Sequence, residues 1–189
     1  MDAALEAEAL VGPRVRLRPF ALEDAPAVLA YASDPEVTRH LEWDAYDDPK
    51  TALAFIRSTH AGGASWIARA IVLRADEVVI GGADLRVVST RDRRAELGYG
   101  LARSHWGQGY ATEAAGLLLR FGFGHLGLVR IEALCSVEND RSVRTLERLR
   151  MRREGRLAQY RWKKGRPRDH YLYALTSAEW SGARGDTPE

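Results

Sequence analysis

The sequence predicts an α+β fold in which helices flank a mixed, mostly antiparallel sheet with one central parallel strand pair. Most of the predicted strands follow one another across short turns, which favours antiparallel pairing. A helical stretch from Thr112 to about His125 separates a strand at residues 96–101 from a strand at residues 130–137. These two strands therefore cannot form a hairpin, and we expect them to pair in parallel through a right-handed crossover.

The N-terminal part supplies one strand and two helices. Apolar and polar residues alternate over Val15–Phe20, which predicts the first strand. A helix should run from Leu22 to near Ser33, with acidic residues in its first turn and a proline early enough to be tolerated. A second helix is predicted from Pro49 to His60, ended by glycines. Val37–Asp48 should be a loop or a short helix.

The remaining elements complete the sheet. Strands are predicted over residues 65–73, 78–89, 96–101, 130–137, 153–162 and 170–176. The last two should form a closing hairpin. Gly81-Gly82 interrupts its strand and indicates a bulge or a close backbone approach. A helix over Arg141–Arg150 should be capped by Asn139 or Asp140.

Length and composition bound the class of protein. A chain of 189 residues with 46% hydrophobic and 29% charged content fits one globular domain, which we place at residues 12–180 with flexible tails at 1–11 and 181–189. No apolar run reaches 18 residues, so no membrane partner is expected. The N-terminus lacks the basic region of a secretory signal, and we expect a cytoplasmic location. The single cysteine, Cys135, permits no internal disulfide and no cysteine zinc site, and no metal is expected.

Charge is distributed unevenly along the chain. Residues 141–170 carry 12 basic and 3 acidic side chains, a net of +9. This block could meet nucleotide phosphates or ribosomal RNA. The alternative is a solvated surface, because only three of the 28 basic residues are lysine and the whole chain favours arginine. Nucleic-acid binding is therefore kept as a lesser alternative.

The turn Trp106-Gly107-Gln108-Gly109-Tyr110-Ala111 ends a predicted strand and opens a helix. Backbone N–H groups at a helix start lack intrahelical partners, and the helix dipole is positive there. Glycines without Cβ atoms let an anion approach the main chain. The physical interpretation is a phosphate or pyrophosphate cradle. The alternative is a glycine turn that binds nothing.

Two familiar cradles fit this turn poorly. A P-loop needs a lysine after the glycines, and none follows here. The Rossmann fingerprint needs a third glycine where Thr112 stands. The full string Trp-Gly-x-Gly-Tyr-Ala-Thr-Glu-Ala instead closely resembles the acetyl-CoA pyrophosphate loop of the GNAT N-acetyltransferases, in particular the RimJ/RimL-like branch. The resemblance extends from about Val15 to Leu175.

This resemblance implies a GNAT fold and acetyl transfer from acetyl-CoA, used as co-substrate, to a primary amine by direct attack. It implies that the parallel strands splay apart and admit the pantetheine arm. In the family's loop pattern Trp106 takes the first place, Gly109 the fourth and Ala111 the sixth. The residues that it implies for cofactor binding are Leu101, Ala102, Trp106, Gly107, Gln108, Gly109, Tyr110, Ala111, Thr112, Asn139 and Ser142.

The resemblance also suggests catalytic residues. Asn139 and Ser142 match the family's Asn-x-x-Ser segment, in which the Asn contacts the cofactor arm and the Ser lies near the thioester sulfur as a proton donor. Their structural alternative is a helix cap and a first-turn serine. Glu96 is the candidate general base, with a salt bridge to Arg94 or Arg69 as its alternative. Arg161 lies near the place where some relatives carry a second carboxylate.

The sequence does not determine which amine accepts the acetyl group. A protein α-amine, with a pKa of about 7.7–8.0, is partly neutral at pH 7 and suits a site with a weak base. Trp43, Tyr46 and Trp66 could line an acceptor pocket or belong to the core, and we interpret Tyr99 as packing. Protein N-termini and small-molecule amines both remain candidates, and a homodimer is compatible with the sequence. A non-catalytic acyl-CoA sensor is the other alternative.

Overall fold

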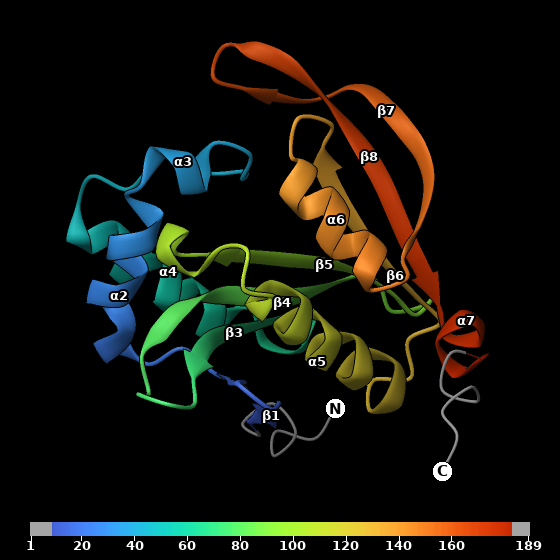
Figure 1. The fold of residues 1–189 in the computed structure, drawn as a ribbon, viewed down its shortest axis with the longest axis horizontal. Helices are drawn as coiled ribbons and strands as arrows, with labels where there is room; N and C mark the ends of the chain where they lie inside the picture. The colour runs from blue at the N-terminus through green and yellow to red at the C-terminus, as the bar shows by residue number, and fades with distance from the viewer. Residues whose placement is uncertain (1–8, 183–189) are drawn as a thin grey trace.

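A computed structural model describes residues 9–182, and most of the predicted tails at 1–11 and 181–189, namely residues 1–8 and 183–189, lies outside this range. Eight strands form one sheet in the order β1-β2-β3-β4-β5-β6-β8-β7 (Figure 1). Of the described strand pairs, β5 with β6 is parallel and the others are antiparallel. The strands are β1 Leu10–Val11, β2 Val15–Arg18, β3 Trp66–Leu73, β4 Val79–Ser89, β5 Arg94–Leu101, β6 Arg130–Ser136, β7 Arg152–Lys163 and β8 Arg166–Thr176. The predicted fold class is confirmed.

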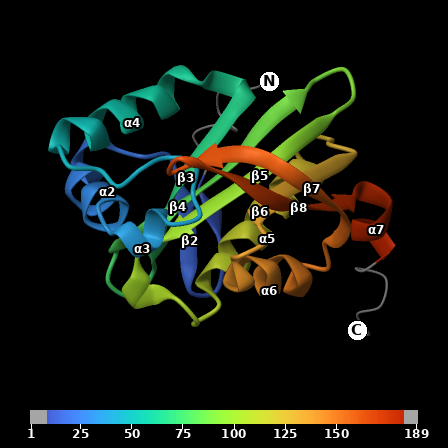
Figure 2. The same ribbon diagram turned by 90° about the horizontal axis from the view of Figure 1, so that it is seen from above.

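Helices cover both faces of the sheet (Figure 2). The helices are η1 Leu22–Asp24, α2 Ala25–Ala32, α3 Pro35–Thr38, α4 Pro49–Ala61, η2 Gly63–Ser65, η3 Arg103–His105, α5 Tyr110–Gly124, α6 Asp140–Arg148 and α7 Ser177–Gly182. One core cluster packs α2, α3 and α4 on β3, through residues such as Val28, Ile56 and Ala70. The other packs α5 and α6 on β2 to β6, through residues such as Leu118 and Ile131.

Several element boundaries differ from the prediction. Leu10–Val11 lies in the expected tail, yet it pairs with β2 as strand β1. The C-terminal tail was expected from residue 181, but α7 continues to Gly182. The helix expected from Leu22 begins as a separate 3-10 turn, since the chain changes helix type at Asp24. Helix α5 starts at Tyr110, two residues before the predicted Thr112.

The parallel pair separates soon after it forms. Pairing of β5 with β6 covers Arg94–Glu96 and Arg130–Glu132 and stops there. The rest of β5 pairs with β4 alone, as far as Leu101. At that end Gly81 makes the predicted close approach, because a Cβ on it would lie 2.2 Å from the Gly100 carbonyl oxygen. The two central strands thus form a V that opens toward the turn after β5.

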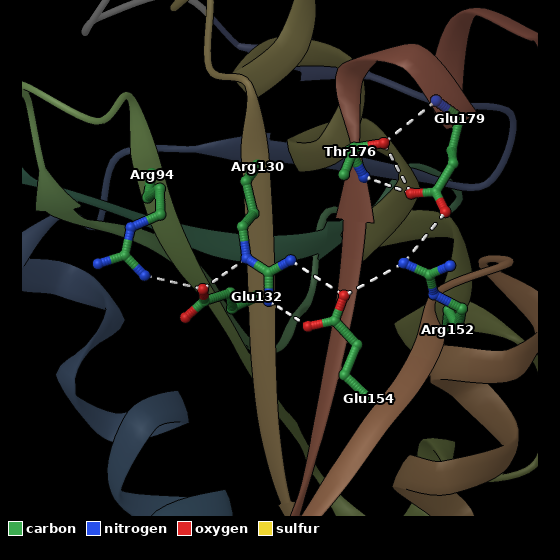
Figure 3. Close-up of polar contacts among 7 residues, drawn as sticks. All are labelled: Arg94, Arg130, Glu132, Arg152, Glu154, Thr176 and Glu179. Carbon is green, nitrogen blue, oxygen red and sulfur yellow. Dashed lines mark hydrogen bonds and ion pairs between the residues drawn. The ribbon is translucent and has the colours of Figure 1, made fainter.

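Ion pairs hold the closed end of this V (Figure 3). Arg94 and Arg130 are register partners on β5 and β6, and their charges would repel each other. Glu132 accepts hydrogen bonds from both, at 2.9 and 2.6 Å. Glu154 on β7 accepts from Arg130 at 2.5 Å. Arg152 connects Glu154 to Glu179 of α7, at 3.3 and 3.8 Å. The network therefore ties β5, β6, β7 and α7 together where the strands still pair.

We expect Glu154→Gln to lower the free energy of unfolding by about 0.5–1 kcal/mol, since solvent screens much of this network. Its hydrogen bond from Arg130 holds the Glu154 pKa below the usual glutamate value. The contribution is therefore present above the ordinary glutamate pKa and disappears as the pH falls through the lowered one. Urea denaturation at several pH values measures this, with exposed Glu23→Gln as control. Equal losses for both variants would contradict a specific role for the network.

Candidate active site

A cavity of about 910 Å³ lies at the open end of the V. It extends from the turn after β5 to the loop at residues 39–48, and it is lined by β4, β5, β6 and α6 on the way. Most of the residues predicted from the sequence line it. They are Glu96, Leu101, Trp106, Gly107, Gly109, Tyr110, Ala111, Thr112, Asn139 and Ser142. The two others, Ala102 and Gln108, do not.

The turn between β5 and α5 has the backbone form of an anion cradle. Gly107 and Gly109 adopt φ angles of 77° and 84°, in the left-handed region that favours glycine. Gly109 is the N-cap of α5. Among the described residues, no acceptor takes the backbone N–H groups from Gly107 to Thr112. A Cβ on Gly107 would meet no atom within 4 Å, so the main chain is open there.

Arg14 and Glu113 hold the cradle in place, and sequence reasoning missed both. The Glu113 carboxylate accepts the backbone N–H groups of Arg14 and Val15, at 2.7 and 3.0 Å. It also pairs with the Arg14 guanidinium at 2.8 Å. Burial alone would raise the Glu113 pKa, but these hydrogen bonds lower it. Arg14 in turn donates to the Gln108 carbonyl at 2.9 Å. Gln108 thus contributes through its backbone to the frame of the turn.

The backbone that could pair with an extended ligand lies at the β5 edge. The Ala102 N–H donates to the Ile80 carbonyl at 2.8 Å, and the Ala102 carbonyl accepts from His105 at 3.0 Å. Backbone groups alternate in direction along an antiparallel strand, so those of Tyr99 and Leu101 face the gap toward β6. The Leu101 carbonyl accepts the Trp106 indole N–H at 2.9 Å. The Leu101 N–H and both groups of Tyr99 remain for a ligand.

Asn139 and Ser142 meet Tyr99 on one side of the opening. The Asn139 side chain caps α6 by accepting the Ser142 N–H at 3.2 Å, so the structural role expected for it is present. The Ser142 hydroxyl lies 2.9 Å from the Tyr99 hydroxyl. Burial raises the Tyr99 pKa above its ordinary value, which is already well above neutral pH, so this phenol is protonated. Tyr99 therefore does more than pack, since it orients the Ser142 hydroxyl.

Glu96 lies on the opposite face of β5. Side chains alternate along a strand, so Glu96 and Gly98 face α2 to α4, whereas Leu97 and Tyr99 face α5 and α6. Burial raises the Glu96 pKa, and Glu42 raises it further, while Arg161 opposes both. Its ion-pair partner is Arg161 at 3.6 Å. Of the two salt-bridge partners considered from the sequence, Arg94 and Arg69, the Arg94 side chain binds Glu132 instead.

Asp84 joins Glu96 on this face, and nothing in the linear sequence predicted it. It lies on β4 directly opposite Gly98, and Arg86 lies opposite Glu96. A Cβ on Gly98 would come within 2.5 Å of the Asp84 carboxylate, so only glycine leaves room for it. The carboxylate accepts the Trp66 indole N–H at 2.9 Å. Burial raises the Asp84 pKa despite this hydrogen bond.

The β7–β8 hairpin covers this part of the cavity. Its tip reaches over toward α3 (Figure 1). Lys163 donates to the Trp43 carbonyl at 2.5 Å and pairs with Asp44 at 2.9 Å. Arg161 pairs with Glu42 at 2.6 Å. The predicted pocket aromatics Trp43, Tyr46 and Trp66 all line the cavity below.

The basic block at residues 141–170 is largely committed to partners within the described chain. Its members Arg152, Arg156, Arg161, Lys163, Arg166 and Arg168 form ion pairs with carboxylates. Arg141 stacks over the Trp106 ring at 4.5 Å, beside the cradle. The block is thus divided between the sheet, the hairpin and the cavity, and it does not favour the RNA-binding alternative.

Within residues 9–182, no helix is long and apolar enough to cross a membrane. No group of three or more His, Cys, Asp or Glu side chains there could hold a metal ion. Cys135 lies buried in β6, and burial raises the pKa of its thiol to about 11.

Comparison with known proteins agrees with this geometry. The family model described as "Acetyltransferase (GNAT) domain" matches residues 14–152. The chain therefore belongs to the GNAT acetyltransferase family, as its sequence predicted.

Individual relatives support the same assignment. The chain is 36% identical over 177 residues to "Uncharacterized N-acetyltransferase p20" of Bacillus licheniformis, which covers 93% of this chain and 99% of the relative. Over 93 residues it is 31% identical to "Putative ribosomal N-acetyltransferase YdaF" of Bacillus subtilis (strain 168), which covers 49% of this chain and 51% of the relative. A GNAT-family acetyltransferase from Bacillus anthracis has a crystal structure that superposes with a TM-score of 0.83 at 27% identity, over 91% of this chain and all of that one.

Proposed function

We propose that this protein is an acetyl-CoA-dependent N-acetyltransferase that acts on a primary amine by direct attack. One observation carries the proposal: a turn with free backbone N–H groups, Gly107 to Thr112, stands at the mouth of a cavity between two splayed parallel strands. Such a turn suits a pyrophosphate, and the gap between the strands suits an extended arm. The cytoplasm, where acetyl-CoA is made available, is the proposed location.

The chain's own groups fit acetyl-CoA along its length. The N–H groups of the cradle would hold the pyrophosphate, with the Thr112 hydroxyl beside them. The Leu101 N–H and the Tyr99 backbone would pair with the amides of the arm. The Asn139 amide nitrogen is left for the arm, because the cap uses only the side-chain oxygen. When bound, acetyl-CoA supplies an activated acetyl thioester.

Two groups on opposite faces of β5 would handle protons. Glu96 is the proposed base, since its raised pKa brings it nearer to that of an amine. Ser142 is the proposed donor to the leaving sulfur, with its hydroxyl oriented by Tyr99. The acceptor amine would therefore enter from the face of Glu96 and Asp84. Likeness to YdaF is compatible with a protein N-terminus as acceptor, and the roofed pocket is compatible with a small amine.

Calorimetric titration with acetyl-CoA and with CoA tests the proposal directly. We expect both to bind, followed by release of free thiol when the protein is screened against primary amines. Absence of binding by both ligands would refute the proposal. Binding without thiol release against protein N-termini, polyamines, amino acids and arylalkylamines would favour the sensor alternative.

Ser142→Ala is expected to lower kcat by about a hundredfold or more, the lower end of what a positioned proton donor contributes. Tyr99→Phe should lower it less, because Ser142 remains. The double variant should be no slower than Ser142→Ala alone, since Tyr99 acts through the Ser142 hydroxyl. Steady-state kinetics at saturating acetyl-CoA measures these rates. If the kcat losses of the two single variants multiplied in the double variant, Tyr99 would act independently of Ser142.

A further inference from the structure

We propose that Asp84 binds the cationic head of the acceptor, and that the acceptor is a primary amine whose body is aromatic or apolar. This inference rests on the proposed function and specifies its second substrate. It concerns the face of the sheet that carries Glu96, opposite the face that carries Tyr99 and Ser142.

The charge state of Asp84 is the first argument. Its carboxylate accepts one neutral hydrogen bond, from the Trp66 indole at 2.9 Å. No Lys, Arg or His nitrogen of the described chain lies within 4.0 Å of it. Asp84 is half-buried, and partial burial of a carboxylate favours either protonation or a cationic partner. We infer that the cationic head of the acceptor is that partner.

Asp24 shows how this protein treats an enclosed carboxylate that serves structure alone. Asp24 is 6% exposed and pairs with the Arg18 guanidinium through both of its oxygens, at 2.6 and 2.8 Å. The hydrogen bonds from Arg18 and Ala21 outweigh burial and lower the Asp24 pKa. Asp84 has no such ion pair among the described residues. The charge of Arg86, two residues away on the same strand, lowers the Asp84 pKa without outweighing burial. The Arg86 guanidinium itself lies over the Trp66 ring, 5.6 Å from its centroid.

The sheet beside Asp84 leaves space for a ligand over Gly100. The register places Gly82 opposite Gly100 and Asp84 opposite Gly98, all on one face. The Asp84 carboxylate fills the space over Gly98, and Phe20 lies 3.0 Å from a Cβ placed on Gly82. A Cβ on Gly100 would find its nearest neighbour 3.4 Å away, on Leu41, so the sheet leaves most space there, between Asp84 and the open end of the V. An amine bound to Asp84 would lie near Glu96, which is on the same face of β5 two residues from Gly98.

The walls indicate the body of the acceptor. Trp66, Phe55 and Phe20 form a chain of edge-to-face contacts, with ring centroids 6.1 and 5.3 Å apart. All three line the cavity, together with Tyr46. Aromatic faces attract both apolar groups and cations. The hairpin contacts through Lys163 and Arg161 roof the same space, which favours a compact amine over a folded polypeptide segment.

The Trp66 indole N–H reports directly on Asp84, because the two groups are hydrogen-bonded. The test is a titration of ¹⁵N-labelled protein with phenethylamine, followed by the Trp66 indole resonance, which Trp66→Phe identifies. The uncharged isostere 2-phenylethanol is the matched ligand. Asp84→Asn is the matched protein, since asparagine keeps an oxygen acceptor for the indole and removes the charge. Asp76→Asn, in the exposed β3–β4 turn, controls for the substitution itself.

We expect phenethylamine to shift the Trp66 resonance of the wild type and of Asp76→Asn at concentrations up to about 20 mM. Its affinity for Asp84→Asn should fall about tenfold or more, the loss expected for one enclosed charge pair. The alcohol should bind the wild type no better than phenethylamine binds Asp84→Asn. Equal affinity of the amine for wild type and Asp84→Asn, or no shift of Trp66 in the wild type, would overturn the inference.

A second measurement distinguishes failure of this inference from failure of the proposed function. Calorimetry with acetyl-CoA on the same proteins reports on the cradle, which Asp84 does not touch. We expect Asp84→Asn to bind acetyl-CoA as the wild type does. Normal acetyl-CoA binding with no role for Asp84 would refute only this inference. Loss of acetyl-CoA binding by the wild type would refute the proposed function, whatever the amine titration shows.

Discussion

Gly109→Glu is expected to weaken acetyl-CoA binding by at least about a hundredfold, a cost of about 2.7 kcal/mol. Gly109 has a φ angle of 84°, so a side chain there is strained. The added carboxylate would also stand at the helix start that we propose for the pyrophosphate, where like charges repel. Calorimetric titration of the variant beside the wild type measures the loss.

Gly127→Glu is the matched control for this change. Gly127 also has a left-handed φ angle, 60°, and a Cβ on it would meet no atom within 4 Å. It is exposed in the loop between α5 and β6, and it does not line the cavity. Both variants place a side chain at a left-handed φ angle and add the same charge, but a Cβ on Gly109 would also lie 3.3 Å from the Arg14 guanidinium. Equal affinity of Gly109→Glu and Gly127→Glu for acetyl-CoA would disprove the cradle.

Glu96→Gln is expected to lower kcat by about a hundredfold, within the usual range for a general base. The effect should be largest for acceptors of high pKa, because their amines are almost wholly charged at neutral pH and need a base most. The KM for acetyl-CoA should stay unchanged, since Glu96 lies on the other face of β5 from Ser142. Kinetics against pH measures this, with exposed Glu23→Gln as control. If Glu96→Gln kept the wild-type kcat, the acceptor amine would lose its proton to solvent and not to Glu96.

The stability of Glu96→Gln should rise near neutral pH, although its activity should fall. Burial raises the Glu96 pKa in the folded protein, so the carboxylate destabilises the fold once it is ionised. Below the pKa that Glu96 has in the unfolded chain, Glu96 is protonated in both states and the fold keeps its full stability. This stability is lost as the pH rises through the higher pKa that Glu96 has in the folded protein. Glu96→Gln should therefore unfold at a higher temperature than the wild type near neutral pH. The difference should vanish in acid, which calorimetry at both pH values would show.

The two faces of β5 explain how one strand can serve two substrates. Tyr99 and Leu101 present their backbone to the gap, and the Tyr99 side chain contacts α6. Glu96 and Gly98 face the α2–α4 side, where Asp84 and the aromatic walls lie. The V between β5 and β6 connects the two sides at the point where pairing stops. An acyl group held in the gap would thus be open to an amine from the other face.

Local signals were sufficient for the fold and for the glycine turn that begins α5. Strand alternation and the helix between residues 101 and 130 required a parallel central pair, and the structure has it. The string from Trp106 to Ala114 identified the family, because glycine positions and a helix start are properties of consecutive residues. The helix cap at Asn139 was recognisable for the same reason. Such features depend on the backbone geometry of a few consecutive residues, and the types of those residues are enough to predict them.

Pairings between distant residues depended on the tertiary structure. Asp84 became a site residue only because strand register sets it opposite Gly98. Glu96 pairs with Arg161, which the sequence did not indicate as its partner, because the β7–β8 hairpin folds back over β5. Tyr99 reaches Ser142 because α6 packs on one particular face of the sheet. Register, strand crossing and helix docking are set by the packing of the whole core, and no short stretch of sequence specifies them.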